Sequence, residues 1–123
     1  MWVLVPVLTE EESDFDFVES LKSNEKIVLL FVVDESLKEV PAGFVGSRIK
    51  SAELIIEKIK NSLPSDIIVK DYVEWGSWHE KIENIAKLEE IDKVVMVQSR
   101  KSESLLPFLK ASGLGYELFK LQQ

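Results

Sequence analysis

The sequence predicts an α/β protein, a three-layer α/β/α sandwich on a doubly wound, five-stranded parallel sheet. Two observations predict this class: apolar runs alternate with stretches of helical periodicity along the chain, and the run at 27–33 is apolar without interruption. An uninterrupted run is typical of a strand that helices cover on both faces. The length of 123 residues and the apolar content of 46% suit one core. We therefore assign 1–123 to a single domain.

The first half of the chain predicts two strands and one helix between them. The first strand is expected over 2–8, and the capping-box sequence at 9–12 predicts that a helix follows directly. Apolar residues at helical spacing form the buried face of that helix: Phe15, Val18 and Leu21. The second strand is the apolar run at 27–33.

Helix breakers follow the second strand, namely Pro41, Gly43 and Gly46. They predict a loop over 34–46 and a second helix that begins near Ser47 and stops at Pro64. Beyond this helix, 66–75 predicts the third strand, and Gly76 turns the chain.

The last third of the chain predicts a helix capped by Ser77, a fourth strand over 93–97, and a short helix. Proline is tolerated in the first turn of a helix, so Pro107 places the start of the short helix near Ser104. Gly113 is expected to end it, and a last strand follows over 116–121.

Several stretches, in order and at consistent separations, carry a resemblance to a known family: Val3–Val7, Leu29–Asp34, Gly76, Ile82, Ala86 and Asp92–Val97. They are similar to strands, a turn and a helix of the universal stress proteins, a Rossmann-like family of the stress response. The resemblance implies the adenine nucleotide alpha hydrolase-like fold, with strand order 3-2-1-4-5. It also implies a homodimer that pairs the last strands of two chains, at Tyr116, Leu118, Phe119 and Leu121.

Nucleotide-binding universal stress proteins carry the signature Gly-x2-Gly-x9-Gly-Ser/Thr after the fourth strand. On that frame Gln98, Lys101 and Ala111 stand at the glycine positions, and only Ser112 matches. Glycine lets backbone N–H groups close on phosphates, which a Cβ hinders. The family's nucleotide-contacting positions correspond here to Leu8, Thr9, Val32, Gln98, Ser99, Arg100, Lys101, Ala111 and Ser112.

Leu8 stands where nucleotide-binding members carry aspartate, and the chain is too short after Ser112 for the helix whose N-terminus faces phosphate. Ser112 is therefore expected at the negative end of a helix, which repels phosphate. We expect no cofactor, and no ATP bound in the family's manner. The function that follows is a non-enzymatic, dimeric regulatory or protective module that contacts an unidentified protein partner.

The alternative is a small-molecule sensor that binds an adenine nucleotide or another anion at the carboxyl ends of strands 1, 2 and 4. Arg100 and Lys101 would supply the positive charge, with hydroxyls from Ser99, Ser102 and Ser104. The same residues also suit a solvated loop with a helix cap, since serines commonly cap helices. Weak ATP hydrolysis stays open, although no metal-binding acid is clearly placed beside this loop.

Composition argues against several classes of function. The formal net charge is −7 without a basic cluster, so nucleic acid is not an expected partner. The chain has no cysteine, which excludes thiolate chemistry. The longest apolar run, 27–33, is too short for a bilayer, so we expect no membrane partner and a cytoplasmic location.

Neither a metal site nor a catalytic site is expected. The acidic run at 10–16 could hold a hard cation, but it also complements a helix N-terminus, which we favour. His79 is the only histidine, and the sequence places no nucleophile and orienting acid around it.

Overall fold

The computed structural model describes residues 1–34 and 42–121. The elements run in the order β1 (Trp2–Pro6), η1 (a 3₁₀ helix, Glu10–Ser13), α1 (Phe15–Leu21), β2 (Lys26–Val33), α2 (Ala42–Ser62), β3 (Ile68–Trp75), α3 (Trp78–Leu88), β4 (Lys93–Val97), α4 (Arg100–Ser112) and β5 (Gly115–Phe119).

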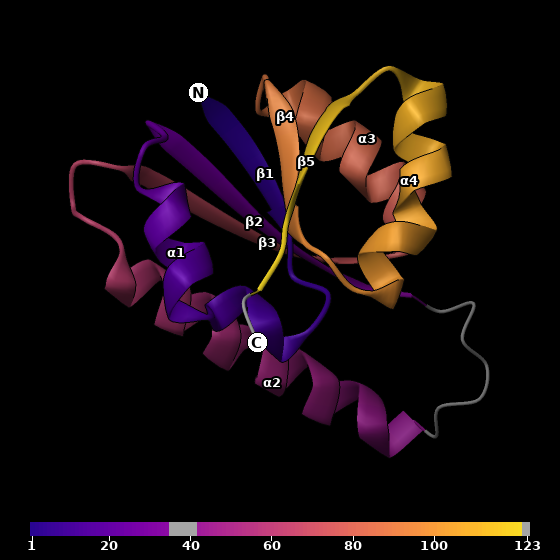
Figure 1. Ribbon diagram of the computed structural model, residues 1–123. Coiled ribbons are helices and arrows are strands. Elements are labelled where there is room, and N and C mark those ends of the chain that lie inside the picture. Colours follow the sequence, from indigo (N-terminus) through magenta and orange to yellow (C-terminus); the bar gives the residue numbers. More distant parts are fainter. Residues whose placement is uncertain (35–41, 122–123) are drawn as a thin grey trace.

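The five strands form one parallel sheet in the order β3-β2-β1-β4-β5. Helices α1 and α2 cover one face of this sheet, and α3 and α4 cover the other (Figure 1). The three-layer fold and the strand order expected from the sequence are therefore confirmed. The carboxyl ends of β1, β2 and β4 meet at one edge because all strands are parallel.

Alternation of side chains along the central strand builds the two halves of the core. Val3 and Val5 of β1 pack with Phe17 of α1 and Ile59 of α2, whereas Leu4 packs with residues of α3 and α4 on the opposite face. Val3, Leu4 and Val5 are 0% exposed, as are Phe17 and Ile59. The uninterrupted apolar character of β1 and β2 is explained by this double coverage.

The first helical segment differs from the prediction. The capping box at Thr9 opens the 3₁₀ helix η1, and α1 begins separately at Phe15, where the Asp14 carboxylate accepts a hydrogen bond from Phe17 N at 3.1 Å. The break rotates the next turn, so Phe15 is 73% exposed while Phe17 is buried. The prediction that Phe15 faces the core was wrong.

Two helix starts were also predicted too late. Helix α2 begins at Ala42 rather than near Ser47, so Gly43 and Gly46 lie inside the helix. A glycine costs a helix only about 1 kcal/mol, which the buried stripe of a 21-residue helix offsets. The rest of the predicted loop, 35–41, lies outside the described residues.

Helix α4 begins at Arg100 rather than Ser104, and Pro107 lies inside it. Pro107 removes a single backbone hydrogen bond inside the helix. The start of the helix is fixed instead by the Ser99 side chain, which caps it. Gly113 ends α4 with φ of +76°, as predicted. β1 ends two residues earlier and β3 begins two residues later than predicted, and β5 begins one residue earlier and ends two residues earlier. Among the described residues, no helix combines the length and apolar character needed to span a bilayer.

Candidate functional site

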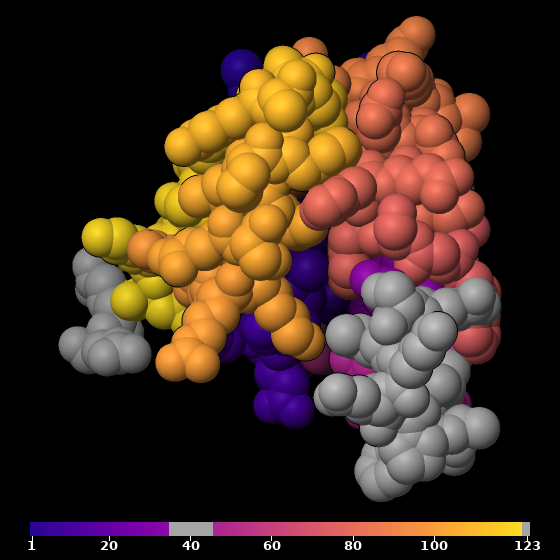
Figure 2. Space-filling model, turned by 90° about the vertical axis from the view of Figure 1, so that its right-hand side faces the viewer, coloured from indigo at the N-terminus to yellow at the C-terminus, as the bar shows by residue number. Residues whose placement is uncertain are grey.

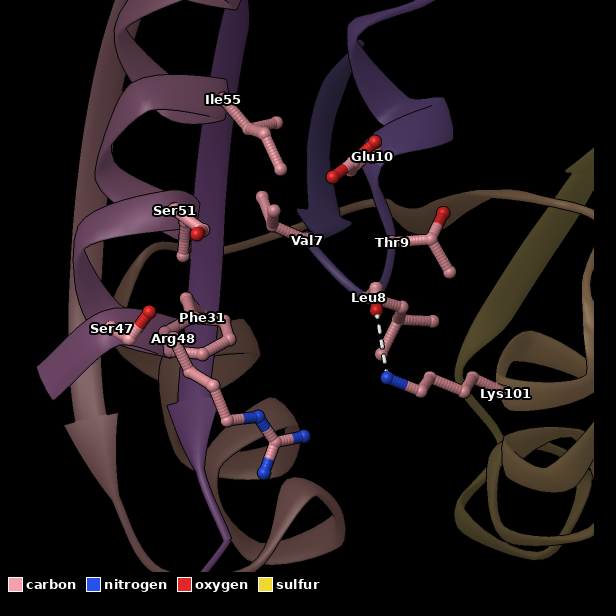
Figure 3. Close-up of a pocket in the computed structure, with 11 residues that line it drawn as sticks. Val7, Leu8, Thr9, Glu10, Phe31, Ser47, Arg48, Ser51, Ile55 and Lys101 are labelled. Carbon is pink, nitrogen blue, oxygen red and sulfur yellow. Dashed lines mark hydrogen bonds between the residues drawn. The ribbon is translucent and has the colours of Figure 1, made fainter. Parts of the chain in front are cut away.

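A cavity of about 290 Å³ opens at the edge of the sheet where β1 and β2 end. It lies between the turn after β1, the first half of α2 and the start of α4 (Figure 3). Viewed from outside, residues of the β1 region lie at the bottom of a hollow beside α4 (Figure 2). The lining residues are Val7, Leu8, Thr9, Glu10, Phe31, Ser47, Arg48, Ser51, Ala52, Ile55 and Lys101.

The turn between β1 and η1 is organised by a buried carboxylate. The Glu12 side chain is 1% exposed, and its carboxylate accepts hydrogen bonds from Leu8 N, from Thr9 N at 3.0 Å and from Thr9 Oγ1 at 2.6 Å. Burial raises the pKa of Glu12 above its ordinary value, and these hydrogen bonds oppose the rise only in part. The backbone N–H groups of this turn therefore point at the protein's own carboxylate.

The turn between β4 and α4 is satisfied in the same way by hydroxyl groups. Ser99 N donates to Ser102 Oγ at 2.7 Å, and Ser102 N donates to Ser99 Oγ at 3.2 Å. Gln98 N donates to Phe119 O at 2.8 Å, which continues the pairing with β5. Ser102 is 0% exposed, so its reciprocal bonds with Ser99 are shielded from water.

Two cationic side chains reach the cavity from different helices. Lys101 Nζ, from α4, donates to Leu8 O at 3.2 Å and so ties the start of α4 to the end of β1. Arg48 comes from α2, and in Figure 3 its guanidinium extends toward Lys101 from the opposite side. Of the two cations that line the cavity, Lys101 was singled out from the sequence and Arg48 was not.

The structure brings together only part of the predicted set. Leu8, Thr9 and Lys101 line the cavity, whereas the other members do not. Gln98, Ser99 and Arg100 lie at the turn after β4. Val32 is buried against the α3 and α4 side of the sheet.

Ala111 and Ser112 lie at the opposite end of α4 from the cavity. At a rise of about 1.5 Å per residue, they are about 16–18 Å along the helix axis from Arg100. The expectation that Ser112 lies at a helix C-terminus is confirmed, and its hydroxyl donates to Leu109 O at 3.0 Å.

Sequence reasoning missed the contribution of α2, because the predicted loop ended where this wall begins. A signal was present, because spacings of three and four residues connect Ser47, Arg48 and Ser51 with Ala52 and Ile55 along one side of a helix. The apolar stripe of α2 therefore continues toward the start of the helix as the polar residues Ser47, Arg48 and Ser51. Phe31 was assigned to a strand without regard to which face it lies on.

The predicted dimer residues pack within the described chain. Tyr116 and Leu118 lie against the α3 and α4 side of the core, and Phe119 and Leu121 against the α1 and α2 side. The rings of Phe119 and Phe17 stack edge to face with centroids 5.5 Å apart. The side chains of β5 therefore contribute to this chain's own core, and its outer backbone edge is the part left for a second chain.

No metal cluster occurs in the part of the chain that the structure describes. Residues 1–34 and 42–121 contain no group of three or more His, Asp or Glu side chains that could hold a metal ion. The His79 ring stacks on Phe108 at 4.6 Å, which joins α3 to α4.

Comparison with solved structures identifies the fold. The chain superposes on the hypothetical protein MJ0577 with a TM-score of 0.73 and 22% identity, over 98% of this chain and 96% of that one. The universal stress protein UspA from Lactobacillus plantarum matches with a TM-score of 0.67 and 17% identity, over 98% and 96%. This chain has the universal stress protein fold.

A third structure, the hypothetical protein PH0823, matches with a TM-score of 0.63 and 20% identity, over 96% of this chain and 94% of that one. No protein-family model matches the sequence, and no curated protein matches it significantly. The resemblance seen in the sequence is therefore confirmed at the level of the universal stress protein fold, by structures that cover nearly the whole chain.

Proposed function

We propose that this protein is a cytoplasmic, non-enzymatic regulatory or protective module that acts as a dimer through protein contacts and does not bind ATP. One observation carries the proposal: the turns after β1 and β4 use their backbone N–H groups internally. Leu8 N and Thr9 N donate to the Glu12 carboxylate, and Ser99 N and Ser102 N donate to each other's hydroxyl oxygens.

A phosphate that used these N–H groups would have to displace bonds that already exist. At the β1 turn it would also have to displace the buried Glu12 carboxylate, which already accepts both N–H groups. A ligand gains little by exchanging one satisfied hydrogen bond for another. These four N–H groups of the turns after β1 and β4 are therefore available to a phosphate only if an existing hydrogen bond is lost.

Isothermal titration calorimetry with ATP, in the presence and absence of Mg²⁺, tests the proposal. We expect no saturable binding below millimolar concentration. Glu12→Gln is the matched variant, because it removes the negative charge and keeps an acceptor oxygen in the turn. A micromolar dissociation constant for the wild-type protein would refute the proposal.

The dimer is supported by the geometry of β5, an edge strand of the sheet. Phe119 O accepts from Gln98 N of the turn after β4, so the N–H and C=O groups of Tyr116 and Leu118, on the alternate register, point to the outer edge. An unpaired edge with apolar side chains invites strand pairing. Sedimentation equilibrium should give a dimer that Leu118→Pro weakens and Glu117→Ala leaves intact, with circular dichroism to verify folding. A wild-type monomer at high concentration would contradict the dimer.

The second candidate function is a small-molecule sensor that binds an adenine nucleotide or another anion at this sheet edge. The cavity with Arg48 and Lys101 favours it, because two cationic side chains line one solvent-open cavity at the sheet edge. Thermal-shift measurements with adenine nucleotides and simple anions distinguish this candidate from a purely protein-binding module.

A further inference from the structure

We propose that the cavity beside Arg48 and Lys101 binds a small organic carboxylate with an apolar body. This inference rests on the second candidate function, the small-molecule sensor. It assigns the ligand class and makes Arg48 of α2 the principal anion-binding residue, in place of the cation pair Arg100 and Lys101 that the sequence suggested.

The two cations are arranged differently around the cavity. Lys101 Nζ is held by Leu8 O at 3.2 Å, which fixes the position of the ammonium and leaves further N–H donors for a ligand. The Arg48 guanidinium has no hydrogen-bond or salt-bridge partner among residues 1–34 and 42–121, and it extends into the space that Lys101 faces (Figure 3). A planar guanidinium matches the two oxygens of a carboxylate.

The charge balance of the lining favours a ligand with one negative charge. Glu10 also lines the cavity, so its carboxylate offsets one of the two cations and leaves one net positive charge. A carboxylate neutralises that charge, whereas a di- or triphosphate places excess negative charge near Glu10. The Thr9 hydroxyl is already committed, since it donates to Glu12 Oε2 at 2.6 Å and accepts from Glu11 N at 3.1 Å.

The remaining walls favour an apolar ligand body of limited size. Val7 is 2% exposed, Ala52 3% and Leu8 9%, and the Phe31 and Ile55 side chains complete the apolar wall. Ligand pockets typically measure about 300–1,000 Å³, so about 290 Å³ suits a small molecule. Ser47 and Ser51 also line the cavity from α2 and add hydroxyl groups to its wall.

Titration of the ¹⁵N-labelled protein with benzoate, followed by two-dimensional NMR, tests the inference. We expect saturable shifts in the turn after β1, in the first half of α2 and at the start of α4, with a dissociation constant of millimolar order or tighter. Benzamide has the same body without the charge, and inorganic phosphate has charge without the body. Both should bind at least ten-fold more weakly, and equal binding by either would overturn the inference.

Arg48→Ala should weaken benzoate binding at least ten-fold, and Lys50→Ala serves as the matched control. Lys50 is an exposed cation on the same helix that does not line the cavity, so its removal changes net charge alone and should alter affinity less than two-fold. Equal effects of the two variants, or no saturable binding of benzoate, would overturn the inference. An ATP arm keeps the two proposals separable, because tight ATP binding refutes the proposed function whatever benzoate does.

Discussion

Replacing Glu89 should destabilise the fold by about 3 kcal/mol, because this residue organises a buried ion network at the amino-terminal edge of the sheet. Its side chain is 5% exposed, and Oε1 accepts from Lys26 Nζ at 2.8 Å and from Lys70 Nζ at 3.0 Å. Oε2 accepts from Tyr72 Oη at 2.5 Å. Lys26 is itself buried, and its ammonium lies 4.4 Å from the centre of the Trp2 ring.

The magnitude follows from the ionisation of this carboxyl group. Hydrogen bonds from Lys26 and Tyr72 lower the pKa of Glu89 from 4.5 to about 2. One pKa unit corresponds to about 1.4 kcal/mol, so the charged form gains about 3 kcal/mol on folding. The share from Lys70, whose side chain is 51% exposed, is screened by solvent. Removing one partner of a buried pair costs a similar amount, about 3–5 kcal/mol.

The same depression of the pKa sets a pH window. A carboxyl group with a lowered folded-state pKa adds stability that is fully present above its unfolded value of 4.5 and is lost as pH falls toward about 2. About two-fifths of the contribution should remain at pH 3. The difference in free energy of unfolding between the wild-type protein and Glu89→Gln should therefore become smaller as pH falls from 4.5 to about 2.

Urea denaturation followed by circular dichroism, at pH 7 and at pH 3, measures both effects. Glu83→Gln is the matched control, because Glu83 pairs with Lys87 at 3.3 Å on the exposed surface of α3, where ion pairs contribute less than about 1 kcal/mol. The reasoning would be refuted if Glu89→Gln lowered the free energy of unfolding by less than about 1 kcal/mol at pH 7, or by the same amount at both pH values.

The remaining predictions concern a turn and two glycines. Glu12→Ala leaves Leu8 N and Thr9 N without their acceptor and should lower the free energy of unfolding in urea by about 2–3 kcal/mol. Glu12→Gln keeps an acceptor oxygen and should lower it by less than about 1 kcal/mol. Burial raises the pKa of Glu12, so its contribution to stability should rise, not fall, as pH drops through the raised value. Gly113→Ala should cost about 1 kcal/mol in thermal unfolding, since φ is +76° and no atom lies within 4 Å of the added Cβ. Gly46→Ala, inside α2 with equally open space, should stabilise by about 0.5–1 kcal/mol, and a destabilising result would contradict this.

Periodicity predicted most of the fold because the sheet is covered on both faces. The central strands had to be apolar throughout, and the helices had to carry one apolar stripe, so both patterns are visible in the sequence. The starts of α2 and α4 were not predictable in the same way. Gly43, Gly46 and Pro107 oppose helix formation locally, and the packing of the whole helix overrides them.

The candidate site was predicted only where it follows the strand ends. Leu8, Thr9 and Lys101 lie next to strands that the apolar runs located, and the parallel topology brings those ends together. Arg48 was not predictable, because its position depends on where α2 begins and on the angle at which that helix crosses the sheet. Which residues of α2 line the cavity depends on tertiary packing, and local sequence patterns do not encode that packing.

Two substitutions relative to the nucleotide-binding signature act together at this edge. Lys101 stands at the second glycine position of the frame, and its side chain crosses to Leu8 O, at the position of the family's aspartate. A glycine would leave the backbone open to a ligand, whereas the lysine brings a positive charge to the carboxyl end of β1. The cavity that stays open lies between this lysine, the end of β1 and the first half of α2 with Arg48. Under the proposed ligand assignment, recognition at this edge is by the side-chain cations Arg48 and Lys101 rather than by backbone N–H groups, which suits a small monoanion better than a phosphate chain.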